Sequence, residues 1–92
     1  MTTNNLLKEC ATILRGEHKA WEGDSILNAE SYLRRFAKDC PNLAHIVADD
    51  IAKNLHSASE ISGLHPNRCQ WIVNRIREYN PLDHVSNFGE PS

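Results

Sequence analysis

Side chains that form directional hydrogen bonds are concentrated between residues 67 and 75. In chain order they are Asn67, Arg68, Gln70, Trp71, Asn74 and Arg75. Asn and Gln amides can bind the edge of adenine, whereas Arg can bind guanine or contact a phosphate. Trp and Arg are also enriched in the hot spots of protein–protein interfaces. This short segment therefore contains groups suited to binding a nucleic acid or a protein.

Other reactive side chains have less informative spacing. Cys40 and His45 are five residues apart, and His65 and Cys69 are four apart. Four such residues could form a tetrahedral zinc site, but neither pair has the spacing of a zinc finger. The glycines are isolated, so no phosphate-binding loop is present. We therefore predict that the protein is not an enzyme and holds no metal or cofactor.

A helix from Pro66 to Tyr79 is predicted to carry the polar segment. Its buried face is indicated by four apolar residues at helical spacing: Cys69, Ile72, Val73 and Ile76. A step of 100° per residue places a second group opposite them: Asn67, Trp71, Asn74 and Glu78. Arg68, Gln70 and Arg75 flank this outer face. If Trp71 points outward, its ring either folds back on Trp21 or the C-terminal tail, or anchors an interface.

A short helix is predicted before this one, beginning at a capping box formed by Ser57 and Glu60. Gly63 and Leu64 follow as a tight turn, because glycine adopts the left-handed conformation that ends many helices. Pro66 then suits the first turn of the next helix, where its missing N–H costs nothing.

The stretch from Ser57 to Tyr79 resembles the helix-turn-helix segment of bacterial and phage DNA-binding regulators. The matching parts are Ala58-Ser59-Glu60-Ile61, Gly63-Leu64, Pro66-Asn67-Arg68 and Ile72-Val73-Asn74-Arg75-Ile76. The resemblance covers about a quarter of the chain. It departs from the family where only Ser62 separates Ile61 from Gly63, which shortens the first helix unless Asp49 to Leu55 takes its place with a longer turn. It implies that residues early in the second helix reach the DNA bases: Asn67, Arg68, Gln70 and Trp71.

Apolar residues at helical spacing predict three further helices, at about 5–18, 24–40 and 42–55. Asp24 or Ser25 can cap the second of these, and Pro41 is expected to end it. No alternating pattern of β-branched and aromatic residues predicts a strand. We therefore expect an all-α bundle of four to five helices with a helix-turn-helix-like C-terminal half. Residues 1–80 would form one domain, and 81–92 a tail that is partly packed or flexible.

Length and charge narrow the function. The chain has 92 residues, with 10 basic and 12 acidic side chains and a net charge of −2. A length of this order argues against an enzyme with a deep cleft. Residues 53–77 contain four basic residues and one acidic residue, a modest basic patch that suits a homodimer with few phosphate contacts per protomer. Arg34, Arg35 and Lys38 either complement the dipole of their helix or contact phosphates.

The chain lacks an apolar run approaching ~18 residues, so no membrane partner is expected. It begins without the pattern of a signal peptide, and its three cysteines are widely spaced, which together predict a cytoplasmic protein. Our first hypothesis is a small regulatory protein that binds double-stranded DNA. The alternative is a phage-type inhibitor or adaptor that binds a larger bacterial protein complex through Trp71, Arg68 and Arg75.

Overall fold

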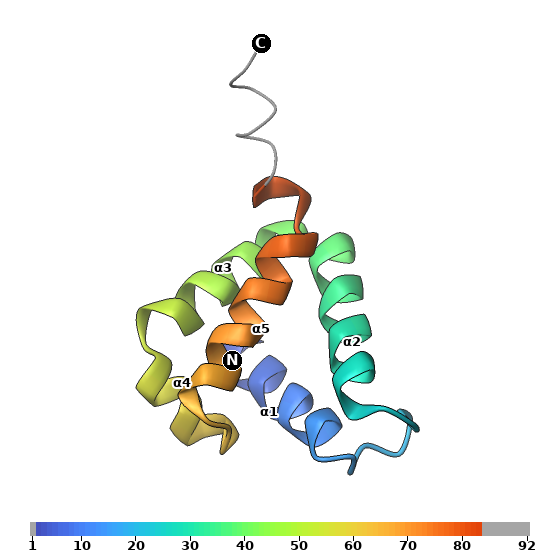
Figure 1. Cartoon of the computed structure of the whole chain (residues 1–92). Helices are drawn as coiled ribbons and strands as arrows, with labels where there is room; N and C mark the ends of the chain where they lie inside the picture. Colours follow the sequence, from blue (N-terminus) through green and yellow to red (C-terminus); the bar gives the residue numbers. More distant parts are fainter. Residues whose placement is uncertain (1, 84–92) are drawn as a thin grey trace.

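A computed structural model of the chain describes residues 2–83, and its regular structure is entirely helical (Figure 1). The helices are α1 (Thr2–Leu14), α2 (Ser25–Asp39), α3 (Pro41–Lys53), α4 (Leu55–Ser62) and α5 (Pro66–Tyr79). Residues 81–83 are helical as well, and no strand occurs within 2–83. The predicted all-α class is confirmed. Most of the predicted tail, from residue 84 onward, lies outside the described residues.

Helix α5 lies between α2 and α3 and packs extensively on both (Figure 1). Its N-terminal end adjoins α4, while α1 packs on α2 and α4. One apolar cluster receives side chains from all five helices, including Leu7 of α1, Leu33 of α2, Val47 of α3, Ala58 of α4 and Ile76 of α5. Within the described part of the chain, no helix combines the length and apolar content needed to cross a membrane.

Two of the helix ends follow the predicted local chemistry. The Asp24 carboxylate accepts hydrogen bonds from the backbone amides of Ile26 at 2.9 Å and Leu27 at 3.2 Å, which caps α2. Helix α2 ends at Asp39, before Pro41 as expected. Pro41 is itself the first residue of α3, because the first turn of a helix leaves its amides unbonded and tolerates proline.

The predicted capping box at Ser57 and Glu60 is wrong. Helix α4 begins at Leu55, and the side chain of Asn54 accepts a hydrogen bond from the Ser57 amide at 3.1 Å. Asn54 is the only residue between α3 and α4, so it ends one helix and caps the next. Glu60 instead pairs with His56 one turn earlier, at 3.5 Å. The cap is therefore three residues earlier than predicted, and the helix before the turn is longer by the same number.

A three-residue turn, Gly63 to His65, joins α4 to α5. Gly63 has φ +75°, the left-handed conformation expected of it. A Cβ at this position would lie 2.6 Å from Nη2 of Arg15. The Arg15 guanidinium fills that space and donates a hydrogen bond to the Ser62 carbonyl at 2.7 Å. His65 caps α5, because its Nδ1 accepts a hydrogen bond from the Asn67 amide at 3.0 Å.

Candidate binding surface on helix α5

Helix α5 presents a polar ridge opposite its buried stripe. The stripe is fully buried, as predicted: Cys69, Ile72, Val73 and Ile76. Asn67, Asn74 and Glu78 are exposed on the ridge, and Gln70 is half-buried at its edge. The Gln70 Nε2 donates a hydrogen bond to Oδ1 of Asn74 at 2.9 Å, so these two amides are held in one orientation. The helical geometry predicted from the sequence therefore places the amide groups on one accessible surface.

Trp71 and Arg68 form a stacked pair beside this ridge. The guanidinium carbon of Arg68 lies 5.2 Å from the centroid of the Trp71 ring. Such a cation–π contact contributes about 0.5–1 kcal/mol at an exposed site. The Trp71 ring is half-buried and also packs against the apolar cluster, so it exposes less surface than an outward-pointing ring would. Arg68 makes no ion pair with a carboxylate of residues 2–83.

A shallow hollow of about 460 Å³ adjoins this pair at the N-terminal end of α5. His65, Asn67, Arg68 and Trp71 line it. His65 was not among the predicted binding residues. Its position just before Pro66 was the available signal, because a residue preceding proline at a helix start occupies the cap and lies beside the first turn.

Arg75 was predicted as a binding residue, but intramolecular ion pairs already hold it. Its guanidinium contacts the carboxylates of Glu78 at 2.7 Å and Glu30 of α2 at 3.3 Å. The Tyr79 hydroxyl donates a further hydrogen bond to Glu30 at 3.3 Å. Burial and the nearby Glu30 carboxylate raise the pKa of Tyr79. Arg75 therefore helps to join α5 to α2, which reduces its availability to a partner.

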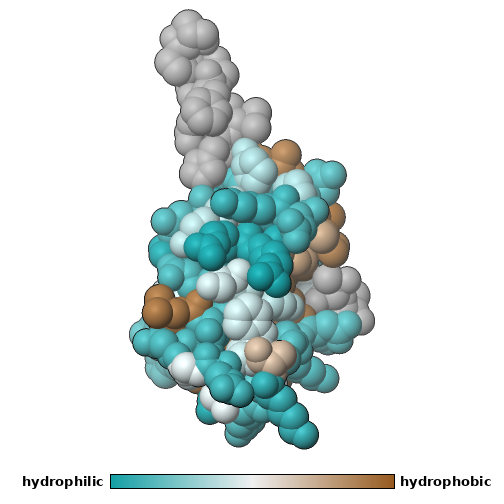
Figure 2. Space-filling model, turned by 90° about the vertical axis from the view of Figure 1, so that its right-hand side faces the viewer, coloured by the Kyte–Doolittle hydropathy of each residue, from teal (hydrophilic) through white to brown (hydrophobic). Residues whose placement is uncertain are grey.

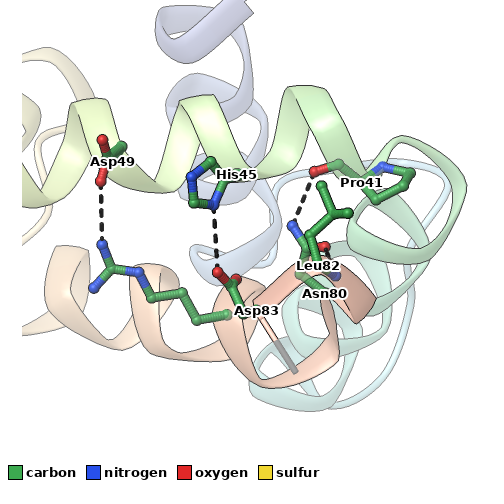
Figure 3. A network of polar contacts seen from close by, with 7 residues as sticks. Pro41, His45, Asp49, Asn80, Leu82 and Asp83 are labelled. Atoms are coloured by element: carbon green, nitrogen blue, oxygen red, sulfur yellow. Dashed lines mark hydrogen bonds and ion pairs between the residues drawn. The ribbon is translucent and has the colours of Figure 1, made fainter. Parts of the chain in front are cut away.

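The four basic residues between 53 and 77 do not form one patch. Arg77 and Lys53 both pair with Asp49 of α3, at 3.5 and 3.6 Å respectively. They lie on the α3 side of α5, where Figure 3 shows the contact with Asp49. Arg75 instead faces α2. The sequence count missed this division because α3 packs along one side of α5 and α2 along the other.

The cysteine and histidine pairs considered for zinc lie at opposite ends of α5. The Asn80 side chain donates a hydrogen bond to the Pro41 carbonyl at 2.9 Å, which places Cys40 near the C-terminal end of α5 (Figure 3). His65 precedes Asn80 by fifteen residues, or roughly 20 Å along a helix. His45 instead contacts Asp83 at 3.3 Å. Within residues 2–83 no three potential metal ligands cluster.

Comparisons with known proteins identify no related site. No protein-family model matches the chain, and neither a curated protein nor a solved structure is significantly similar to it. The chemistry of the α5 surface is therefore the basis for assigning a function.

Proposed function

We propose that this protein is a small regulator that binds double-stranded DNA through α5. The observation that carries the proposal is the α4–α5 pair, in which a left-handed Gly63 turn precedes a helix with an exposed polar ridge. A helix-turn-helix protein likewise carries its second helix after a short turn and inserts that helix into the major groove.

The first turns of α5 hold the groups best suited to base contact. Asn67 is exposed there, and the Arg68 guanidinium has no carboxylate partner among the described residues. An Asn amide can bind adenine through two hydrogen bonds, and Arg can bind guanine in the same way. Gln70 and Asn74 lie one and two turns further along, where they would contact neighbouring bases or the sugar-phosphate backbone.

The modest charge of this surface favours a homodimer over a tightly binding monomer. With Arg75 and Arg77 paired to carboxylates, Arg68 is the principal free cation on α5. Each neutralised phosphate adds about one counterion to those released on binding, so one protomer alone would bind weakly. Two protomers on adjacent half-sites would double the number of phosphate contacts.

Titration of a labelled random-sequence duplex at ~50 and ~200 mM salt tests the proposal. We expect measurable binding at the lower salt and a steep loss at the higher one. Asn67→Ala should lower the affinity for duplexes selected from a random pool by roughly tenfold, since a specific base contact contributes ~1–3 kcal/mol. Asn5→Ala removes an exposed amide from α1 and should leave the affinity unchanged. Absence of binding at ~50 mM salt would overturn the proposal.

A protein-binding function is the second candidate, and the Arg68–Trp71 pair beside its hollow favours it. A guanidinium stacked on an indole beside a shallow concavity has the composition of an interface hot spot. The protein would then act as an inhibitor or adaptor docked on a larger bacterial complex. Affinity capture distinguishes this function if one partner binds the wild type and is lost with Arg68→Ala, while duplex DNA binds neither.

A further inference from the structure

Three cations on α2 form a second charged surface beside α5. Arg34, Arg35 and Lys38 are all exposed. None of them pairs with a carboxylate of residues 2–83. Asp39 lies one turn beyond Arg35 but makes no ion pair with it. Figure 2 looks onto the α2 side of the molecule, which is mostly hydrophilic.

The dipole of α2 does not account for this cluster. Favourable interaction of a cation with the negative end of a helix is confined to about the last turn. Helix α2 ends at Asp39, and Lys38 is the one basic residue in that turn. Arg34 and Arg35 lie further from the end, where the helix dipole contributes little to their stability.

The α2 cations continue the surface of α5. The guanidinium carbon of Arg34 lies 6.0 Å from the centroid of the Tyr79 ring on α5. Lys38 follows Arg34 by one turn on the same side of α2. On α5, Arg68 lies two turns before Arg75, whose pairing with Glu30 marks the edge that faces α2. The two carboxylates at this junction, Glu30 and Glu78, both contact Arg75. Arg34, Arg35 and Lys38 thus form a strip of cations on α2 without a carboxylate partner among residues 2–83. Arg68 also has none, and it lies eleven residues before Tyr79, or roughly 16 Å along α5.

We propose that this strip on α2 binds the phosphate backbone of the same DNA duplex that α5 contacts. The inference rests on the proposed function. It places on α2 the phosphate contacts that α5 alone cannot supply. Helices packed side by side have axes about 8–10 Å apart, a separation over which one duplex can touch both. Arg and Lys at these positions would bind phosphates without reading sequence.

The salt dependence of binding measures such contacts directly. Each lost phosphate contact lowers the slope of log affinity against log salt by about 0.9. The triple variant Arg34→Gln/Arg35→Gln/Lys38→Gln should therefore lower the slope by about 2.7 for each protomer on the duplex. Between ~50 and ~200 mM salt, the wild type would lose roughly 40-fold more affinity than this variant for each bound protomer, and a homodimer would show both contributions.

A matched control removes the same charge elsewhere. Lys8→Gln/Lys19→Gln/Lys53→Gln also lowers the net charge by three, at exposed positions on α1, the α1–α2 loop and α3. Its slope should stay near that of the wild type. Arg34→Lys/Arg35→Lys keeps the charge of the strip and should restore the wild-type slope. Circular dichroism and thermal melting verify that each variant is folded.

The outcomes separate this inference from the proposed function. Binding of the wild type with equal slopes for the two triple variants overturns the role of α2 and leaves the α5 proposal standing. Failure of the wild type to bind any duplex at ~50 mM salt overturns both. A reduced slope in the α2 variant alone, restored by the lysine variant, establishes the strip as a phosphate-binding surface.

Discussion

Asn80 is a polar residue whose side chain is fully buried just after α5. Its Nδ2 donates to the Pro41 carbonyl and its Oδ1 accepts from the Leu82 amide, both at 2.9 Å (Figure 3). The side chain thereby joins the end of α5 to the start of α3. No apolar residue of similar size could satisfy the carbonyl and the amide together.

Asn80→Ala is expected to lower the free energy of unfolding by about 1–3 kcal/mol, because it removes the two hydrogen bonds that the buried side chain makes to the backbone of Pro41 and Leu82. Urea denaturation measures the loss. Asn74→Ala removes an exposed amide from the same helix and should change stability by less than ~0.5 kcal/mol. Equal unfolding midpoints for the two variants would contradict the role given to Asn80.

Two arginines of the predicted binding segment differ in whether they are available to a partner. Arg68 and Arg75 lie on the same helix two turns apart, yet only Arg75 meets carboxylates. Its partner Glu30 is 45 positions away in sequence. A candidate list drawn from local sequence includes both residues, because local spacing does not reveal a distant carboxylate.

At the scale of elements, the α4–α5 turn needs a residue that can adopt a left-handed conformation and that leaves room for the Arg15 side chain. Gly63 adopts a left-handed conformation, which costs other residues about 1–2 kcal/mol. It also leaves the space occupied by the Arg15 guanidinium of the segment after α1. Arg15 in turn binds the last carbonyl of α4, so the turn is tied to a distant part of the chain.

Gly63→Ala should destabilise the protein somewhat more than a substitution that only places a side chain in a left-handed conformation, because the added methyl group would displace the Arg15 guanidinium from its hydrogen bond to Ser62. Gly23→Ala is the matched control, because Gly23 has φ +94° and a methyl group added there would meet no atom within 4 Å. We expect a loss of about 1–2 kcal/mol for Gly23→Ala and a larger one for Gly63→Ala, measured by urea denaturation. Similar losses would show that the Arg15 contact contributes little.

Boundaries were the least predictable property of the elements. Apolar residues at helical spacing correctly indicated α1, α2, α3 and α5, whereas α4 was predicted from the incorrect capping box. Asp24, Pro41 and Gly63 marked helix ends as expected. The start of α4 was missed because Asn54 and Ser57 are both good caps. The choice between them depends on where α3 ends, which is a consequence of packing rather than of local preference.

At the scale of the whole molecule, burial controls how the protein responds to alkaline pH. Burial, with smaller effects from Cys10 and Glu9, raises the pKa of Tyr32 to about 12. Burial also raises the pKa of the Cys10 thiol. In the unfolded chain both groups ionise at lower pH, so folding favours their neutral forms.

The contribution of these two groups to the free energy of unfolding should consequently be complete below about pH 8.5 and fall as the pH rises toward 12 and beyond. The free energy of unfolding falls with rising pH because the pKa values are higher in the folded state, so the unfolded state loses its protons at a lower pH. Urea denaturation at increasing pH measures this fall, and tyrosinate absorbance should show Tyr32 ionising later than a free tyrosine. An unfolding midpoint constant between about pH 8 and 12 would contradict the assignment.

The sequence alone determined the helical class, the buried stripe of α5 and the glycine turn before it. Each of these depends on residues within a few positions of one another, so spacing and local conformation are sufficient. Only the tertiary structure decided which cations are free. Glu30 and Asp49 reach Arg75 and Arg77 because α2 and α3 pack on opposite sides of α5. The same packing leaves Arg68 and the three α2 cations without carboxylate partners among residues 2–83, although the whole chain carries a small negative charge.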